Sequence, residues 1–388
     1  MVKKTAKLIY AFLIILSSTV YAETKLGAEI SFNSGWGHLS SPFLQNDDFW
    51  FSTAQAKVKI APAFSSSVKA YLEGRFDICS VPQMINPIDN SVIPAEAQTS
   101  WSLHKAYMKF RLPFGFKEEN IRIAAGKMPL SWGYGLFYNA GDLIFGGNPL
   151  SSNKIDSSKT TSLSFSSSTL SEFRTLTDWI FTLTVPLVKG IQIEAVALPP
   201  IENASLYNYG RFGGRVQFNW ELAALENMEA GYIAEGNFSS QSMYVSFDGN
   251  IWFDYNANAK GELKKDEGLK KESLEFSLSL SKIFNVRTDV QNHQLQIRWE
   301  GLWTPFAEKS GVFGFVSYQA AETVSLSGTY IFSSITGDNR KVEDKSHFLG
   351  FSIVWEPVKA LELSAATMMN VKNPNELCTV TAGIKYRY

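Results

Sequence analysis

Hydrophobic and polar residues alternate with a period of two along most of the chain. In the segment 274–281, leucine and phenylalanine at even positions interleave with glutamate and serine at odd positions. The same alternation recurs in 105–112, 294–300 and 323–330. A period of two gives a β-strand one apolar face and one polar face, whereas a helix would repeat every 3.6 residues. The sequence therefore predicts an all-β protein.

Seventeen segments read as such strands, each bounded by polar residues or by Gly, Pro and Asn. They are 24–33, 48–61, 66–77, 101–112, 119–129, 175–186, 189–198, 208–220, 226–236, 241–254, 272–283, 290–303, 311–320, 322–333, 345–356, 359–369 and 377–388.

Two architectures accommodate two-faced strands of this kind. A β-sandwich buries the apolar faces against each other, whereas a transmembrane antiparallel β-barrel turns them toward lipid and lines its lumen with the polar faces. The segments have 10–14 residues, which is enough for the roughly 9–11 that a tilted strand needs to cross a bilayer. Aromatic residues near strand ends match the interfacial girdles of barrels. They are Trp50, Trp101, Trp179, Trp220, Trp299, Trp303, Trp355 and Tyr388.

The connections between the strands also alternate in length, as they do in barrels. Two are short enough for tight periplasmic turns, 186–190 and 357–359. Four are predicted as long external loops: 77–100, 130–160, 255–271 and 334–346.

The final segment ends on an aromatic residue. Val380, Ala382, Ile384, Tyr386 and Tyr388 form an apolar face, and the residues between them are polar or glycine. This pattern resembles the C-terminal signature of Gram-negative-type outer-membrane proteins, which implies recognition by the barrel-assembly machinery. Such a strand can pair with the first strand and leave the sheet without free edges.

The number of strands should be even if both ends of the barrel sheet lie on the periplasmic side. Seventeen segments therefore mean that one strand is miscounted, and the conflict lies between 208 and 283. Either one of the segments 226–236 and 241–254 is wrong, or Thr161 to Ser168 forms an extra strand. We expect 16 strands, with 18 as the alternative. Both give an interior too wide for side chains alone to fill.

The first 22 residues have the features of a cleaved secretory signal peptide. Lys3, Lys4 and Lys7 precede an apolar run, and the stretch ends on Ala22. Nine apolar residues are too few for a helical membrane span. We expect residues 23–388 to form a single barrel in the outer membrane of a double-membraned bacterium.

A second resemblance lies in the segment 126–142. It begins Gly126-Lys127-Met128, continues through Trp132-Gly133-Tyr134-Gly135, and includes Asn139 and Asp142. This stretch is similar to a motif of porin-like barrel families, including alginate-export-like porins. The glycines permit sharp bends, so the loop could either fold into the lumen as a constriction or remain an external loop.

Composition and charge limit the other classes of protein. The chain has 388 residues, with 36 Lys and Arg against 37 Asp and Glu, 14% aromatic residues and a mean hydropathy of −0.08. Abundant aromatic residues and a net charge of only −1 exclude disorder, and the chain lacks the excess of basic residues that nucleic-acid binding requires. Two cysteines form at most one disulfide, so a disulfide-stabilised scaffold of this length is excluded. Cys79 and Cys378 could pair or remain thiols.

The polar faces of the predicted strands contain the residues that we expect to line the lumen. Acidic candidates are Glu73, Glu194, Glu275, Glu300 and Glu362, and Arg215 and Arg298 are basic candidates on later strands. Most basic candidates share one wall, which would enrich anions in a pore, although a mixed charged lining is typical of any water-filled barrel. The pore-lining candidates on this wall are Lys57, Lys59, Lys69, Arg75, Lys105, Lys109, Arg111 and Arg122.

A search for catalytic motifs favours a channel over an enzyme. None of the four histidines has a zinc-ligand spacing, and no P-loop, dinucleotide motif or H-E-x-x-H occurs. We expect no cofactor or metal, and the partners are outer-membrane lipids and small polar solutes, in a monomer or trimer. The function predicted is a porin for small hydrophilic solutes, leaning toward anions. The alternative is a surface adhesin or structural barrel without transport.

Overall fold

The computed structural model describes most of the predicted barrel. The described residues are 23–38, 48–81, 84–85, 92–93, 96–112, 120–146, 176–200, 210–222, 224–286, 293–307, 309–336, 343–372 and 378–388. The predicted signal peptide (1–22) and the segment 161–168 lie outside them, so both stay predictions.

In this part of the chain, eighteen strands form one antiparallel sheet. Two short strands, β4 (Met84–Ile85) and β5 (Val92–Ile93), pair with each other, and the 3₁₀ helix η1 spans Gly236–Phe238. The eighteen strands are β1 (Glu23–His38), β2 (Asp48–Ala63), β3 (Val68–Val81), β6 (Glu96–Leu112), β7 (Ile121–Met128), β8 (Asp178–Val188), β9 (Ile191–Leu198), β10 (Arg211–Leu222), β11 (Leu225–Glu235), β12 (Ser240–Asn250), β13 (Asp254–Lys264), β14 (Gly268–Asn285), β15 (Gln294–Thr304), β16 (Lys309–Ala321), β17 (Val324–Thr336), β18 (Glu343–Val358), β19 (Leu361–Asn370) and β20 (Cys378–Arg387).

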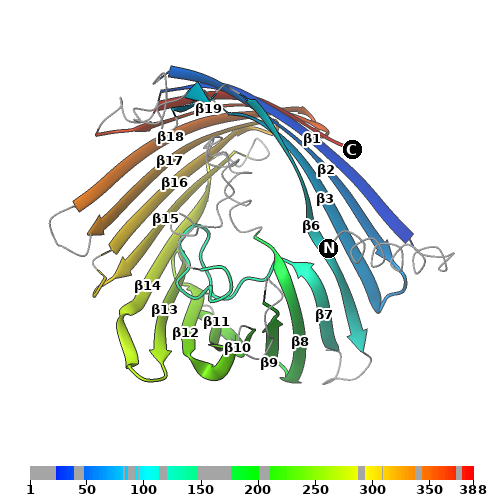
Figure 1. Cartoon of the computed structure of the whole chain (residues 1–388), viewed down its shortest axis with the longest axis vertical. Coiled ribbons are helices and arrows are strands. Elements are labelled where there is room, and N and C mark those ends of the chain that lie inside the picture. The colour runs from blue at the N-terminus through cyan, green and yellow to red at the C-terminus, as the bar shows by residue number, and fades with distance from the viewer. Residues whose placement is uncertain are drawn as a thin grey trace.

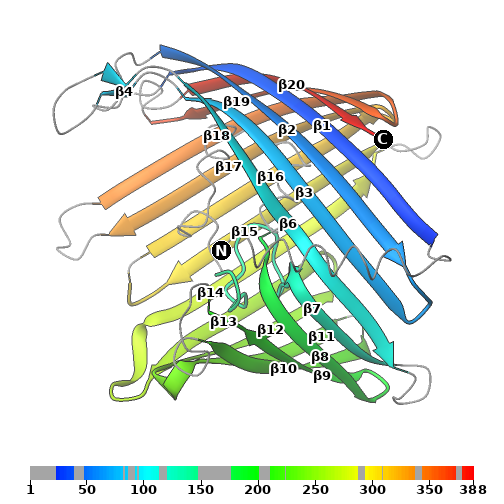
Figure 2. The same cartoon turned by 45° about the vertical axis from the view of Figure 1, so that its right-hand side comes forward.

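The sheet closes on itself. Each strand pairs with the next one in the sheet, and β1 pairs with both β2 and β20. Backbone hydrogen bonds between Ala28 and Tyr388 extend this last ladder to the end of the chain. Figures 1 and 2 show the resulting ring of tilted strands, with the blue first strand beside the red last one. The predicted closure by the C-terminal strand is confirmed, and closure leaves no unpaired sheet edge.

The preferred count of 16 strands is wrong, and the alternative of 18 is confirmed. Both doubtful segments, near 226–236 and 241–254, are strands (β11 and β12), and the missing strand is β13. Apart from Asp254, it lies inside the segment 255–271, which was expected to be an external loop. Small residues at 257, 259 and 261 occupy one of its faces, so the strand lacks the apolar signal that marks its neighbours.

Strand lengths differ from the sequence prediction in both directions. Strand β7 has 8 residues where 11 were predicted, whereas β14 has 18 where 12 were predicted, because a hydrogen-bonded ladder can continue beyond the apolar belt. Parts of the expected loops 77–100 and 334–346 are therefore strand. The two tight turns are confirmed, since only 189–190 and 359–360 separate the strands there. We call the end of the barrel with these turns the turn end, and the opposite end the loop end.

Burial in the sheet is inverted relative to a soluble protein. Large apolar side chains point away from the barrel, as with Trp50 (75% exposed), whereas Glu73, Glu229 and Glu300 are buried inside it. All eight aromatic residues predicted for the girdles are exposed on the outer face. An apolar outer surface is stable only in lipid, so the fold is that of a transmembrane barrel. No helix in the described ranges is both long and apolar enough to cross a membrane.

The two cysteines do not pair. Cys79 lies within β3, and Cys378 begins β20. Strands β1 and β2 separate them. Cys79 shares the parity of the inward Glu73, whereas Cys378 shares the parity of the outward Val380, so the two thiols point to opposite faces of the sheet.

Candidate functional site

One non-strand segment lies inside the ring of strands. Residues 129–146 leave the loop end of β7 and turn inward, where Figures 1 and 2 show them as the teal coil within the barrel. We call this stretch the inward segment. Its hydrogen bonds to the inner wall decide between the two readings of the loop 130–160: the described part folds into the lumen. Residues 147–160 lie outside the described residues.

The inward segment owes its tight path to glycine and to short-range side-chain bonds. Gly133 (φ +69°) and Gly135 (φ +144°) adopt backbone conformations that side chains disfavour. A Cβ atom on Gly135 would also approach the carbonyl oxygen of Tyr138. The Asn139 side chain donates to the Trp132 carbonyl at 2.9 Å. Asp142 Oδ1 accepts from two following backbone amides, a common device for a turn.

A single buried carboxylate anchors the middle of the inward segment. Glu300 of β15 accepts hydrogen bonds from the backbone amides of Leu136 (2.8 Å), Phe137 (2.7 Å) and Tyr138 (2.7 Å). Arg298 on the same strand forms an ion pair with Glu300 at 2.5 Å. Because bonds to an ionised acceptor are stronger than neutral ones, three of them at one carboxylate fix the backbone firmly.

Two further carboxylates hold the start of the inward segment. The indole Nε1 of Trp132 donates to Glu194 at 2.8 Å, and the backbone amide of Gly133 donates to Glu229. Arg215 lies between these acids, 3.0 Å from Glu194 and 2.9 Å from Glu229. The guanidinium compensates both charges, so the carboxylates can remain ionised acceptors in a buried place.

Neutral side chains complete the attachment. Asn258 of β13 receives a bond from the Tyr134 amide at 3.0 Å and donates to the Tyr134 carbonyl at 2.5 Å. Ser277 of β14 accepts from the Ala140 amide at 2.9 Å. Backbone groups of the inward segment therefore find hydrogen-bond partners on strands β11, β13, β14 and β15 of the wall.

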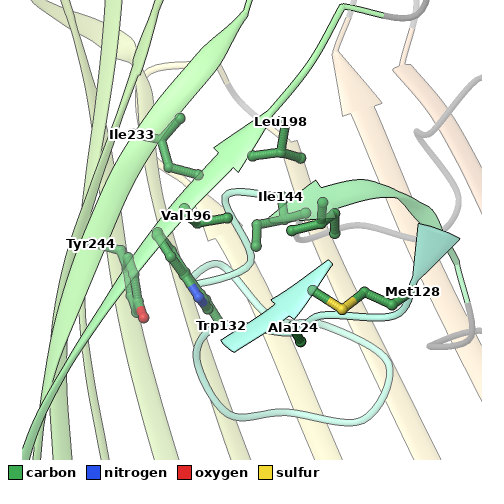
Figure 3. Packing of buried hydrophobic residues seen from close by; sticks show 9 residues of the cluster. Ala124, Met128, Trp132, Ile144, Val196, Leu198, Ile233 and Tyr244 are labelled. Atoms are coloured by element: carbon green, nitrogen blue, oxygen red, sulfur yellow. The ribbon is translucent and has the colours of Figure 1, made fainter. Parts of the chain in front are cut away.

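Apolar contacts secure one end of the inward segment. Trp132 is fully buried and stacks on Tyr244 of β12, with ring centroids 5.8 Å apart. Figure 3 shows Trp132 beside Tyr244 and Val196, with Ile144 of the same segment pointing into this cluster. Burial of a tryptophan contributes several kcal/mol to such a contact.

The other apolar contact lies toward β15–β19. Phe137 stacks on Phe313 with centroids 4.6 Å apart, and Tyr138 packs beside it. A Cβ atom on Gly311 would meet the Tyr138 hydroxyl, so glycine leaves room for this ring. Burial, together with the charge of Glu300, raises the pKa of Tyr138, which keeps the phenol neutral.

The register places the eight predicted basic residues on the inner face. Residues opposite each other on adjacent strands share a face. Arg122 lies opposite Thr184, which lies opposite Glu194, the acid that contacts the inward segment. The other basic residues face the same way, because residues two apart on one strand also share a face. The directly opposite pairs are Arg111 with Arg122, Lys109 with Lys69, Lys105 with Glu73, and Lys57 with Arg75. That these residues line a conducting pore stays a prediction.

Four of the eight basic residues are in ion pairs with two buried acids. Glu29 of β1 lies 2.9 Å from Lys57 and 3.8 Å from Lys59. Glu73 of β3 lies 3.0 Å from Arg75 and 3.2 Å from Lys105. We call Lys57, Lys59, Arg75 and Lys105 the paired group. Glu29 has the right alternation for the inner face, although it is not among the acidic candidates predicted from the sequence.

The other four basic residues are exposed on the same face. They are Lys69 of β3, Lys109 and Arg111 of β6, and Arg122 of β7. None of them lies within 4 Å of a carboxylate in the described residues. We call these four residues the basic quartet.

Other acidic candidates are placed as follows. Glu275 pairs with Lys260 at 3.3 Å, and Glu362 pairs with Arg387 at 2.5 Å. From the sequence, Glu194 and Glu300 are predicted only as lumen residues, and Glu229 and Asn258 are not among the candidates. Alternation marks them as inward-facing, but nothing in the sequence indicates that a segment far along the chain binds to them. No group of three or more His, Cys, Asp or Glu side chains in the described part of the chain could hold a metal ion.

Comparison with known proteins identifies related folds. No protein-family model matches the chain, and no curated protein matches it in sequence. Among solved structures, it is similar to a BenF-like porin from Pseudomonas fluorescens Pf-5, with a TM-score of 0.54 and 11% identity over 94% of this chain and 98% of that one. OccK9 (OpdG) from Pseudomonas aeruginosa gives a TM-score of 0.53 at 8% identity, with 94% and 98% covered.

A third match has the same character. OccAB3 from Acinetobacter baumannii gives a TM-score of 0.50 at 9% identity, with 94% and 99% covered. The porin-like resemblance is thus supported at the level of fold, whereas the alginate-export-like part stays a prediction. The chain has the fold of an outer-membrane porin: a closed barrel of eighteen antiparallel strands, counted over the described residues, with an apolar outer face.

Proposed function

We propose that the protein is an outer-membrane channel through which small hydrophilic solutes diffuse, with a preference for anions. We place the turn end of the barrel toward the periplasm and the loop end toward the outside of the cell. The inward segment narrows the passage because it is bound to one side of the inner wall.

The exposure of the basic quartet carries this proposal. The quartet lies on the inner face of a closed barrel, and yet all four side chains are exposed to solvent. Solvent therefore reaches the inner wall on the side away from the anchors of the inward segment. Positive charge along a confined aqueous path raises the local concentration of anions and lowers that of cations.

The paired group contributes less to this preference. Each of its cations lies within 4 Å of Glu29 or Glu73, so the two carboxylates offset half of the four positive charges. The net positive charge of this wall comes mainly from the basic quartet. This supports a modest preference for anions rather than strict exclusion of cations.

Purified protein reconstituted into a planar bilayer tests the proposal. We expect discrete conductance steps, and in a KCl gradient a reversal potential with the sign that reports chloride over potassium. A reversal potential favouring potassium would contradict the anion preference and leave the channel in place. An absence of channel events in protein that is shown to be folded would favour the alternative of an adhesin or structural barrel.

A further inference from the structure

The basic quartet has an arrangement that folding alone does not explain. Lys69 lies directly opposite Lys109, and Arg111 lies directly opposite Arg122. Lys109 and Arg111 are two residues apart on β6 and share a face. Like charges directly opposite each other destabilise a sheet. The four cations therefore form a compact block on three neighbouring strands, and the block has a cost in stability.

No acid of the described residues compensates this cost. Among the residues that the structure describes, the quartet has one polar side-chain partner, Gln192, which accepts from Arg122 at 2.7 Å. The ammonium of Lys109 lies 5.3 Å from the ring centroid of Tyr107. The neighbouring paired group shows the contrast, because there two buried acids hold four cations. Within the described residues, the side chains of Lys69, Lys109 and Arg111 form no hydrogen bond or ion pair, and Arg122 keeps N–H groups beyond its bond to Gln192, so the quartet can bind a solute.

The block lies at the turn-end side of the inward segment. Lys69 and Arg122 are each the second residue of a strand that starts at the turn end, and Arg111 is the second-last residue of β6. Tyr107 lies one step closer to the loop end and packs against the apolar cluster of Trp132. Tyr71 stacks on Tyr107 with centroids 5.5 Å apart. A solute that passes the inward segment therefore meets the quartet next.

The chemistry of the block defines the ligand. Guanidinium groups present paired N–H donors that match phosphate and carboxylate oxygens, and ammonium groups add point charges. Cross-strand neighbours have Cβ atoms about 5 Å apart and diagonal ones about 7–8 Å apart. Four long side chains at this spacing can contact one small anion together. A monovalent anion would satisfy only part of the charge.

We propose that the basic quartet is a binding site for a small multivalent oxyanion, one that carries phosphoryl groups or several carboxylates. This inference rests on the proposed channel function and specifies the solute class at the turn end of the same lumen. The site would hold such anions as they leave the inward segment, and a high salt concentration would weaken binding because it screens the charges.

Inorganic pyrophosphate, citrate and benzoate are the probes for the test. Each is added to the bath of single channels in KCl, and the concentration that halves the current is measured for wild type and for the double variant K109Q/R111Q. We expect pyrophosphate or citrate to block wild type at a concentration at least tenfold lower than benzoate. In K109Q/R111Q the blocking concentration should rise at least tenfold. Comparing pyrophosphate with citrate shows whether the site favours phosphoryl or carboxylate oxygens.

The matched control removes two positive charges from the opposite part of the wall. Lys260 and Lys264 of β13 are each in an ion pair, with Glu275 and Glu267, so K260Q/K264Q should change the blocking concentration less than twofold. A blocking concentration that is equal in wild type and K109Q/R111Q, or no difference between benzoate and the multivalent anions, would overturn the inference.

A second measurement separates this result from a failure of the channel proposal. Equilibrium dialysis of labelled pyrophosphate against detergent-solubilised, folded protein needs no conductance. Binding by wild type that falls at least tenfold in K109Q/R111Q supports the site even if no current is seen. A conducting, anion-selective channel that binds no pyrophosphate or citrate would leave the proposed function standing and remove the multivalent-anion site.

Discussion

The two sides of the inner wall use their charges in opposite ways. On one side, Glu194, Glu229 and Glu300 are buried beneath the inward segment, and each accepts hydrogen bonds from it. On the other side, the basic quartet is exposed, with no carboxylate of the described residues within 4 Å. Both sets point inward by the same alternation along their strands. They differ in burial because the inward segment covers the three carboxylates and does not cover the basic quartet.

The comparison shows that inward orientation alone does not define a functional residue. A buried charge with all its partners in place acts as an anchor, because breaking its contacts leaves an uncompensated charge. An exposed charge without a partner retains its full field in the lumen. Four variants test this distinction, and their expected effects run from a large loss of local stability to a small gain in global stability.

Glu300→Ala should have the largest effect. Each hydrogen bond to the carboxylate contributes about 1.5–3 kcal/mol, and three backbone amides lose their acceptor together. We expect the local opening free energy to fall by at least about 3 kcal/mol, which corresponds to amide hydrogen exchange roughly 100-fold faster at residues 136–138. Hydrogen-exchange mass spectrometry measures this.

The control for this variant is Glu362→Ala. Glu362 is also buried, and it pairs with Arg387 instead of the inward segment. Its loss should leave exchange at residues 136–138 unchanged. If Glu300→Ala also left that exchange unchanged, the apolar contacts of Phe137 and Tyr138 would be sufficient to hold the segment, and the carboxylate would not be its anchor.

Lys57→Met should destabilise the whole barrel. Lys57 is buried and lies 2.9 Å from Glu29, whose other cations, Lys59, Arg387 and Lys385, lie 3.8, 3.8 and 3.9 Å away. Removing one partner of a buried pair costs about 3–5 kcal/mol, and the remaining cations should reduce this to about 2 kcal/mol. Urea unfolding in lipid vesicles measures the change. The double variant K57M/E29Q should recover most of the loss, and no recovery would indicate a packing defect instead.

The strand pattern explains why so much of the fold could be predicted. Alternation at positions such as 274–281 reports which side chains meet lipid, since only a barrel exposes Phe276 and Leu278 while burying Ser277 and Ser279. The closing strand could be predicted in the same way, because alternate residues from Val380 to Tyr388 are apolar. Strand β13 was missed because its outward residues at 257, 259 and 261 are small, and small residues carry little hydrophobic signal.

The anchoring of the inward segment could not be predicted in the same way. Leu136 and its acceptor Glu300 are 164 residues apart, and Trp132 and Glu194 are 62 apart. The glycines showed that the segment could bend, but the residues that hold it are ordinary inward positions of distant strands. Likewise, the alternation selects the eight basic residues on neighbouring strands, but only the contacts to Glu29 and Glu73 divide them into two groups of four.

Trp132→Phe separates packing from hydrogen bonding at the start of the inward segment. Phenylalanine keeps an aromatic ring against Tyr244 but removes the 2.8 Å bond to Glu194. We expect a local loss of about 1–2 kcal/mol, seen as exchange roughly tenfold faster at residues 131–134. Trp299→Phe, on the outer face, is the control and should not alter this exchange. Equal exchange in both variants would mean that packing alone holds this end.

Lys69→Gln should have the smallest effect, and its sign should be opposite to that of Lys57→Met. Lys69 lies opposite Lys109 with no carboxylate of the described residues near it, so its removal relieves a like-charge contact. We expect the free energy of unfolding to rise by about 0.2–1 kcal/mol. The gain should disappear near 1 M salt, where the Debye length is about 3 Å. Urea unfolding in vesicles at low and high salt measures both. A loss of stability in Lys69→Gln would place the quartet with the anchoring charges, because a cation that stabilises the barrel has a partner and is not held free for a solute.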